Sequence, residues 1–323
     1  MQWVGVFLCT HAPRWCPSWI SGSFGDKQSL LAENMVVARV LAWEGCACRP
    51  MFLSVTMKPK INYRLSIATG THKGDRDYQQ DRVEVLRHPY EKQCLMVVVA
   101  DGMGGRSGGS QASRQVVESA REMLRQFDVG KDDPSVMLRR LVADAHVVIR
   151  MLNVSSELEP HSTIAAHLLL PSGANHWVHS GDSRIYHFRK GRLLMRTRDH
   201  SYVQGLIDKG EISEAESIGH EKSHLLTGCL GMDMEPPIAL ACIDQIEVGD
   251  AVLSCTDGLW AYFSEDELAK MAYALTPADA CKQLLGIARA RAAGRGDNVS
   301  LAILKATAAT ANLPDERLID FEL

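Results

Sequence analysis

The sequence predicts an α+β fold in which helices pack on antiparallel sheets, and three observations support this. Two long segments, 110–127 and 134–145, place apolar residues at helical spacing. Residues 95–100 are apolar throughout, as in a strand buried on both faces. Between residues 163 and 188, three short apolar runs follow one another across tight turns, which favours an antiparallel meander over a doubly wound parallel sheet.

The composition is that of an ordinary globular protein and excludes several classes of function. The 323 residues carry a net charge of −4, with both signs mixed along the chain, so we expect no nucleic-acid partner. No apolar run approaches the roughly 18 residues of a membrane helix, and the apolar residues 4–9 lack the basic flank of a secretory signal. Nine cysteines, an odd number, indicate free thiols in a reducing cytoplasm.

Residues 1–56 differ in composition and in hydrophobic periodicity from the rest of the chain, and we expect a poorly ordered extension there. They hold four of the six tryptophans and four of the nine cysteines, but only 29–43 has the spacing of a helix. The cysteine spacing matches no zinc-finger pattern. Well-patterned sequence begins just after Met57, which could serve as a start codon. We therefore expect a folded domain over 57–308 and a mobile tail over 309–323.

The remaining elements follow in order from local signals. Residues 62–69 alternate as a strand and lead into a polar loop at 74–81. Asp133 and Pro134 mark the start of the second long helix. Residues 199–236 are polar and show no regular periodicity, which is typical of a segment that leaves the core. After a strand at 251–255, two helices begin at the capping box of Ser264 and at Thr276, and a strand at 299–304 completes the domain.

Acidic residues stand repeatedly at the ends of the predicted strands. Asp101 follows the strand 95–100, Asp257 follows 251–255, Asp297 precedes 299–304, and Asp81 ends the polar loop. Each alone is more often a turn residue. Carboxylates brought together repel one another, however, so a cluster is stable chiefly when a divalent cation lies between them. Oxygen ligands favour magnesium or manganese, so the repetition indicates a metal site.

Two other motifs allow different interpretations, a calcium-binding loop and an esterase site. The run that begins at Asp75 superficially resembles a calcium loop but lacks the sixth-position glycine and has Leu86 in place of the final glutamate. Gly105-x-Ser107-x-Gly109 fits the nucleophile elbow of an esterase. A downstream acid, together with His179, His200 or His220, could then complete a catalytic triad with Ser107. That hypothesis leaves the strand-end acids unexplained, and we expect Ser107 to be an ordinary loop residue.

An ordered set of short motifs over about residues 62–305 resembles the bacterial form of the metal-dependent protein phosphatases, the type 2C-like family. Each motif is weak alone, but their order and spacing together are specific. The motifs are Gly74-x-Arg76-x-x-x-Gln80-Asp81, Asp101-Gly-Met-Gly-Gly105, Ser162-Thr163, Gly181-Asp-Ser-Arg184, Asp199-His-Ser201, Asp257-Gly258 and Asp297-Asn298.

The resemblance implies a four-layer sandwich of two antiparallel sheets flanked by helices, with a metal centre at one end. It also implies hydrolysis of protein phosphoserine or phosphothreonine through in-line attack by a water that bridges two Mn²⁺ or Mg²⁺ ions. The implied partners are phosphoproteins and an opposing Ser/Thr kinase, including kinases of type VI secretion systems. The implied enzyme is a monomer, with residues 199–236 as a flap beside the site that helps to select substrates.

The resemblance also assigns roles to single residues. Asp101 resembles the carboxylate that bridges both metals, and the Gly102 carbonyl a ligand of one of them. Asp257 and Asp297 match ligands of the other metal. Arg76 resembles the clamp for the phosphate, as a guanidinium can grip two phosphate oxygens.

Asp81 is expected to orient or deprotonate the metal-bound water, and with Gln80 to contact metal through water. Four positions depart from the family pattern. Gln80 replaces the usual Glu, Gln79 replaces the usual Asn, Met103 replaces the histidine of the eukaryotic form, and His161 replaces a glycine usual in bacterial members. No general acid is assigned from the resemblance. A phosphoprotein-binding pseudophosphatase is the rival from another class, disfavoured because the principal site residues are all present.

Overall fold

The computed structural model describes residues 63–155, 159–217, 219–309 and 319–322. Contacts divide the chain into two units, of which the second runs from Lys60 to Leu323. The predicted extension over 1–56, its helix at 29–43 and Met57 lie outside the described residues.

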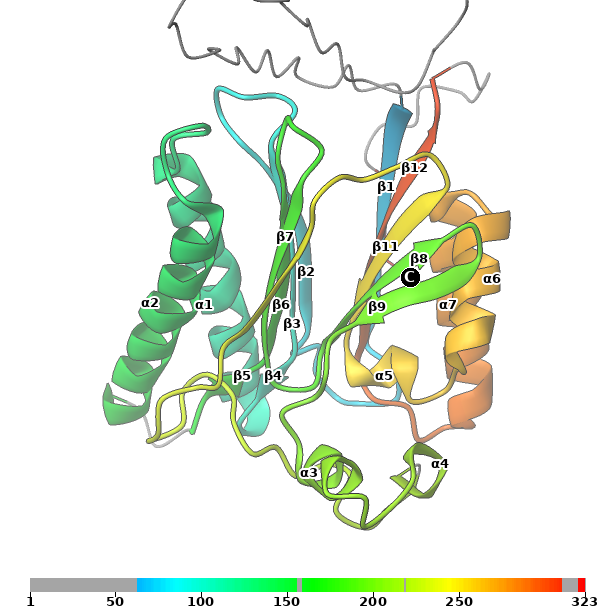
Figure 1. The fold of residues 1–323 in the computed structure, drawn as a ribbon. Helices are drawn as coiled ribbons and strands as arrows, with labels where there is room; N and C mark the ends of the chain where they lie inside the picture. The colour runs from blue at the N-terminus through cyan, green and yellow to red at the C-terminus, as the bar shows by residue number, and fades with distance from the viewer. Residues whose placement is uncertain (1–62, 156–158, 218, 310–318, 323) are drawn as a thin grey trace, which may run out of the picture. The chain divides into compact units, whose positions relative to one another are not determined.

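Two sheets lie face to face in the middle of this unit (Figure 1). In spatial order, the first sheet contains β13 (Ile319–Glu322), β1 (Tyr63–His72), β12 (Val299–Ala308), β11 (Asp250–Cys255), β8 (Arg184–Arg189) and β9 (Arg192–Arg196). The second contains β10 (Ala239–Ile243), β7 (Asn175–Ser180), β6 (Ile164–Leu169), β3 (Leu95–Ala100) and β2 (Arg82–Arg87). All neighbours are antiparallel except β1 and β13, which are parallel.

Helices cover the outer face of each sheet. The long helices α1 (Gly105–Gln126) and α2 (Pro134–Ser155) pack on the second sheet, and α6 (Glu265–Ala274) and α7 (Pro277–Ala292) pack on the first (Figure 1). A third apolar cluster, which includes Val97 and Val252, fills the space between the sheets. The predicted α+β sandwich with helices on both outer faces is confirmed, and β3 is buried on both faces as predicted.

The predicted meander is only partly correct. β6 and β7 pair as expected, but β8 pairs with β11 in the opposite sheet. The chain changes sheets through Gly181, whose φ of 106° is in the region that favours glycine. Strands β2, β9 and β10 were not among the predicted elements. All three are edge strands. Charged side chains interrupt the apolar pattern of β2 and β9, whereas β10 is a short run of five residues without a polar alternation.

Two further segments differ from expectation. The flap is not simply irregular, because α3 (Tyr202–Asp208) and α4 (Glu214–Ser217) lie within it. In place of a wholly mobile tail, residues Ile319–Glu322 form β13 beside β1, while residues 310–318 lie outside the described part. Of the helices in the described ranges, none has the length and apolarity that a bilayer crossing requires.

Helix α1 begins five residues earlier than predicted, so Ser107 lies in its first turn and not in a loop. The glycines Gly105, Gly108 and Gly109 lower helix propensity and hid this start. Packing explains one of them, since a Cβ added at Gly109 would lie 2.4 Å from the Gly102 carbonyl oxygen. The close approach of α1 to the end of β3 therefore outweighs local propensity.

Candidate metal and phosphate site

The predicted acids meet because they stand at one end of both sheets. Asp81 precedes β2 and Asp101 follows β3, and these strands are antiparallel neighbours in the second sheet. Asp257 follows β11 and Asp297 precedes β12, which are antiparallel neighbours in the first sheet. In an antiparallel pair, the end of one strand lies beside the start of the next, so the order of the strands brings all four residues to the same edge of the sandwich.

Asp81 is buried and joins the two sheets. Its Oδ2 accepts a hydrogen bond from the Thr256 hydroxyl at 2.8 Å. Thr256 follows β11 of the first sheet, whereas Asp81 precedes β2 of the second. Its Oδ1 is buried and has no hydrogen-bond partner within the described part of the chain. Burial raises the pKa of Asp81 to about 8, the Thr256 hydrogen bond acts against this, and Asp257 and Asp297 raise the pKa further. The carboxylate is thus held in place with one oxygen still available.

Asp101 and Asp257 share this electrostatic environment. Burial raises the pKa of Asp101 well above its usual value, and Asp81 and Asp257 add to the effect. Burial also raises the pKa of Asp257 to about 6, with Asp297 as the next cause, and the Oδ1 of Asp257 is buried without a partner. Mutually repelling, oxygen-only donors with unpaired atoms are the environment that a divalent oxygen-preferring cation would stabilise. The residues present therefore fit magnesium or manganese.

Within the described ranges, no three Asp, Glu, His or Cys side chains are gathered tightly enough to hold a cation by themselves. This agrees with the like charges of the acids, which keep carboxylates apart unless a cation draws them together. A site that also used a backbone carbonyl and waters, as magnesium sites commonly do, needs fewer side chains at once.

Arg76 lies at the rim of the acidic cluster. Its Nη2 contacts the Asp297 carboxylate at 2.7 Å, and 64% of the Arg76 side chain is exposed. Its loop is fitted closely to the segment that precedes β12, because a Cβ added at Gly74 would lie 2.0 Å from the Asp297 carbonyl oxygen. Asp75 fastens the same loop by accepting a hydrogen bond from Gly296 N–H at 2.8 Å. The predicted clamp is therefore next to the acids, with its guanidinium facing solvent.

Gln80 and Gly102 lie next to the acids in sequence and contact the start of α1. The Gln80 amide nitrogen donates to the Gly105 carbonyl at 2.6 Å, so this side chain is tied to the start of α1. The Gly102 carbonyl lies against Gly109 in the first turns of α1. Neither residue makes a contact with the four acids among the described hydrogen bonds.

Asp182 is a residue of this site that the sequence did not single out. It precedes β8, which pairs with β11. The last pair of these strands joins Arg184 to Cys255, and two residues beyond that pair the chain reaches Asp182 on one side and Asp257 on the other. Its side chain is about nine-tenths buried, and burial followed by Asp257 raises its pKa well above the usual value. The signal was available in the Gly181-Asp-Ser-Arg184 motif, but only the sheet pairing shows that this acid faces Asp257.

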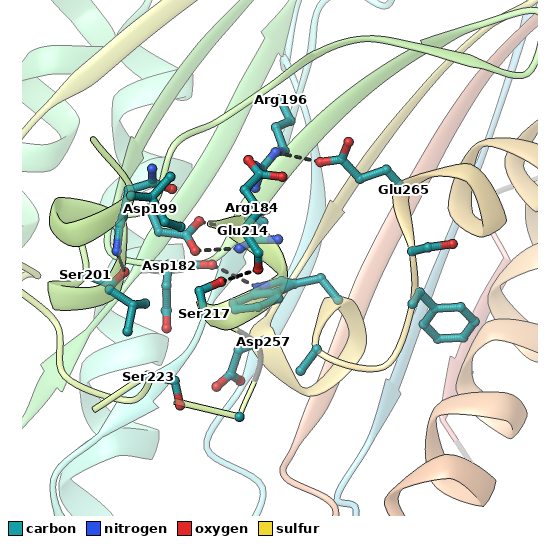
Figure 2. Close-up of a pocket in the computed structure, with 18 of the residues that line it drawn as sticks. Asp182, Arg184, Arg196, Asp199, Ser201, Glu214, Ser217, Ser223, Asp257 and Glu265 are labelled. Atoms are coloured by element: carbon teal, nitrogen blue, oxygen red, sulfur yellow. Dashed lines mark hydrogen bonds and ion pairs between the residues drawn. The ribbon is translucent and has the colours of Figure 1, made fainter. Parts of the chain in front are cut away.

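A cavity of about 630 Å³ opens beside Asp257, between the flap and the start of α6 (Figure 2). Arg184 holds the flap at its base through two hydrogen bonds to Asp199, at 2.8 and 2.7 Å. Arg196 on β9 reaches both Glu214 of the flap, at 2.6 Å, and Glu265 of α6, at 2.7 Å. The flap is therefore tied by ion pairs to elements on both sides of the cavity.

The residues of the esterase hypothesis are not brought together. Ser107 lies in the first turn of α1, and no hydrogen bond in the described part of the chain joins it to a histidine. The His179 ring stacks on the His200 ring with centroids 4.4 Å apart, and His179 hydrogen-bonds the Arg198 carbonyl at 2.8 Å. These two histidines fasten the base of the flap.

Comparisons with known proteins agree with this arrangement. The Ser/Thr protein phosphatase PstP of Mycobacterium tuberculosis is 28% identical over 209 residues, which are 64% of this chain and 40% of PstP. The crystal structure of the PstP catalytic domain in complex with two manganese ions matches with 27% identity and a TM-score of 0.64, covering 75% of this chain and 98% of that one. PppA, described as a key regulatory component of the type VI secretion system in Pseudomonas aeruginosa, matches with 25% identity and a TM-score of 0.62, covering 75% and 97%.

The chain thus spans about two fifths of the length of PstP, the first curated relative it matches. The solved domains, in contrast, are covered almost completely, which confirms the two-sheet fold. A family model described as protein phosphatase 2C matches residues 70–286, from β1 into α7. That range includes Arg76 and the acids Asp81, Asp101 and Asp257. The chain belongs to the protein phosphatase 2C family.

Proposed function

We propose that this chain is a metal-dependent protein phosphatase that hydrolyses phosphoserine and phosphothreonine. The observation that carries the proposal is the convergence of buried carboxylates with unpartnered oxygens at one end of the sandwich, with an exposed arginine at their rim. Family membership and the activity named for the relatives support it. The same acids would have no role in a serine esterase.

In this proposal Asp101, Asp257 and Asp297, with the Gly102 carbonyl, hold two divalent cations, Mn²⁺ or Mg²⁺. When bound, such ions lower the pKa of water and neutralise charge on the phosphoryl group. Asp81, with one oxygen fixed by Thr256 and the other unpartnered, accepts a hydrogen bond from the attacking water and orients it. Gln80 uses its amide nitrogen on Gly105, which leaves its amide oxygen for a water at the same site.

Arg76 binds the phosphate in the proposed reaction. A guanidinium can donate two parallel hydrogen bonds to phosphate oxygens, which fixes the orientation of the group for in-line attack. In the structure Arg76 contacts the Asp297 carboxylate. Arg76 must therefore release Asp297 and bind the phosphate instead when Asp297 binds a cation. The solvent exposure of the arginine makes this exchange inexpensive.

We further propose that the chain works in the cytoplasm as a monomer and opposes a Ser/Thr kinase. The match to PppA supports a kinase of a type VI secretion system as the first candidate. A phosphoproteome of a deletion strain would name the substrates: phosphosites that rise in that strain are expected to belong to the kinase and its targets.

The experiment that tests the activity measures phosphate release from a phosphothreonine peptide by the purified full chain. We expect turnover with MnCl₂ or MgCl₂, its loss in EDTA, and no loss with a serine-directed reagent. Loss with the serine reagent and persistence in EDTA would restore the esterase hypothesis. Binding of the phosphopeptide without turnover at any metal concentration would make the protein a pseudophosphatase.

A further inference from the structure

The short strands β4 (Gly102–Met103) and β5 (His161–Ser162) continue the ladder of β3 and β6 past Asp101. Val99 pairs with Ala165, and farther along the same two segments Met103 pairs with His161, with the register unshifted. Between these pairs, the Asp101 N–H donates to the Thr163 hydroxyl and the Thr163 N–H donates to the Asp101 carbonyl, both at 2.9 Å. Asp101 and Thr163 are therefore opposite one another.

This register places His161 and Asp101 on the same face. Side chains alternate along a strand, and directly paired residues share a face. Val97, Val99 and Ala165, which have the same parity as Asp101 and His161, pack in the cluster between the sheets. His161 is thus the diagonal neighbour of Asp101 on the face turned to the opposite sheet, at the roughly 7–8 Å typical of diagonal pairs.

The imidazole of His161 is oriented by its own strand. Its Nδ1 lies 2.8 Å from the Glu159 carbonyl oxygen. Because a carbonyl can only accept, Nδ1 carries a hydrogen and Nε2 is the ring atom left for another partner. The backbone of β5 is held on both sides, by Met103 of β4 and by two hydrogen bonds between Ser162 and Leu230, at 3.1 and 2.9 Å. The ring is therefore preorganised on the face that carries Asp101.

Two other histidines, His179 and His200, belong to the base of the flap. His179 and His200 stack on each other, and the Nδ1 of His200 accepts a hydrogen bond from Gly181 N–H at 3.1 Å. Two acidic residues flank His161. Asp101 lies on the same face, across the ladder, and Glu159 lies two residues before His161 in the same segment. His179 pairs with Ala165 and so also lies on the face of Asp101, but the Arg198 carbonyl occupies its Nε2. The Nε2 of His161, in contrast, has no hydrogen-bond partner among the described residues.

We propose that His161 protonates the leaving oxygen of the substrate serine or threonine; this inference rests on the proposed function. As the water oxygen forms its bond to phosphorus, the bond from phosphorus to the substrate oxygen breaks and its electron pair stays on that oxygen. The ring reacts as an imidazolium, with hydrogens on both Nδ1 and Nε2. Its Nε2 proton passes to this oxygen, the water loses a proton to solvent, and the neutral imidazole that results takes up a new proton at Nε2 from solvent. The Nδ1–H bond to Glu159 keeps the ring aligned throughout.

The test compares two substrates that differ in their need for a proton on the leaving group. With a phosphoserine peptide, whose alkoxide is a poor leaving group, His161→Gln is expected to lower kcat by about 100-fold or more, the usual contribution of a general acid. With p-nitrophenyl phosphate, whose nitrophenolate leaves unprotonated, the loss is expected to be about threefold at most. Met103→Leu, which changes the cross-strand partner of His161, is the matched control and should keep both activities.

Two further readouts separate catalysis from structure. The thermal midpoint and its increase with MnCl₂ should be the same for His161→Gln and the unsubstituted protein, and free imidazole should restore part of the peptide activity of His161→Gly. Equal losses on both substrates, or an unchanged peptide rate, would overturn the inference while leaving the proposed function intact. An unsubstituted protein that hydrolyses neither substrate would overturn the proposed function and this inference with it.

Discussion

Asp101 bears a large share of the electrostatic cost of the site. Burial raises its pKa well above the usual value, and Asp81 and Asp257 add to this, so the ionised form destabilises the metal-free protein. We predict that Asp101→Asn raises the thermal midpoint without metal, by about 2–4 °C for each kcal/mol of repulsion removed. The same variant should lose the stabilisation by MnCl₂ and at least about 100-fold in phosphate release, since even the outer partners of metal ligands are worth 10–100-fold.

Ser107→Ala is the matched control for this prediction. Ser107 is exposed in the first turn of α1, near Asp101 in sequence but without a part in the proposed chemistry. We expect turnover, the thermal midpoint and the response to MnCl₂ to be nearly unchanged. A result in which Ser107→Ala is inactive while Asp101→Asn still responds to metal would point back to the esterase hypothesis.

Arg76 is expected to influence metal and phosphate in opposite directions. In the metal-free protein it occupies the Asp297 carboxylate, and an exposed ion pair of this kind is worth about 0.2–1 kcal/mol. Arg76→Gln should therefore tighten Mn²⁺ binding by at most about fivefold. It should also lower kcat/KM for a phosphopeptide by about 10- to 100-fold, because a charge-assisted fork to the phosphate is lost.

Arg76→Lys serves as the comparison, because it keeps the charge but not the fork. Its Mn²⁺ affinity should match that of the unsubstituted protein, whereas its kcat/KM should lie between those of the two other forms. Calorimetric titration with MnCl₂ and steady-state kinetics measure the two effects. A parallel fall of metal affinity and kcat/KM in Arg76→Gln would contradict the exchange of Asp297 for phosphate.

At the scale of residues, position along a strand was the information that the sequence carried best. Asp101 and Asp257 could be placed at strand ends because the apolar runs before them are unambiguous. The direction of a side chain could not be predicted in the same way. Gln80 turns to the start of α1 because Gly105 offers a carbonyl there, and Asp182 faces Asp257 because β8 crosses to the other sheet. Both depend on contacts between segments far apart in sequence.

At the scale of elements, the flap is held by a few ion pairs and has little apolar core of its own. Arg196 bridges α4 and α6 through Glu214 and Glu265. We predict that Arg196→Met, which keeps the aliphatic stem, makes amide hydrogen exchange in 209–217 about two- to thirtyfold faster, since two such pairs are worth about 0.5–2 kcal/mol. Exchange in the strands of both sheets should be unaffected.

Arg198→Met is the matched control for the flap. Arg198 pairs with Asp208 within the flap region and does not reach α6, so its loss removes a charge without breaking the bridge. Exchange in 209–217 should change less than in Arg196→Met. If the two variants behave alike, the flap is held by its own packing and not by the link to α6.

Element boundaries were least predictable where packing outweighs propensity. Three glycines argue against a helix at 105–109, yet α1 begins there because Gly109 allows it to approach the Gly102 carbonyl. The starts of α6 and α7 were placed correctly, because their caps are local: Ser264 and Glu267 form the predicted capping box, and the Thr276 hydroxyl accepts from Asp279 N–H.

At the scale of the whole molecule, the pairing of strands decides the function. Apolar runs predict that strands exist but not which sheet receives each one, since any two runs of similar length could pair. The turn at Gly181 sends β8 away from β7, and only this change of sheet brings Asp182 beside Asp257. The site at one end of the sandwich is thus a property of topology, which the family resemblance supplied and the residue patterns alone did not.

The closed interior between the sheets also sets how the protein responds to acid. His167 on β6 is fully buried there, with Nδ1 3.1 Å from the Asn175 amide oxygen and Nε2 without a partner. Burial lowers the pKa of His167 to about 4, although the bond to Asn175 acts against it. Between pH 6.5 and 4 the unfolded chain binds a proton that the folded chain does not, so the free energy of unfolding falls as the pH falls.

We therefore predict that His167 contributes a loss of about 2 kcal/mol in the free energy of unfolding between pH 7 and pH 5, growing to about 3 kcal/mol near pH 4. His167→Gln, which can still donate to Asn175 but does not titrate, should lack this part of the pH dependence in urea unfolding. His220→Gln in the flap is the control and should retain the native slope. Equal slopes for His167→Gln and the unsubstituted protein would mean that His167 takes up a proton in the folded state, and that water reaches the space between the sheets.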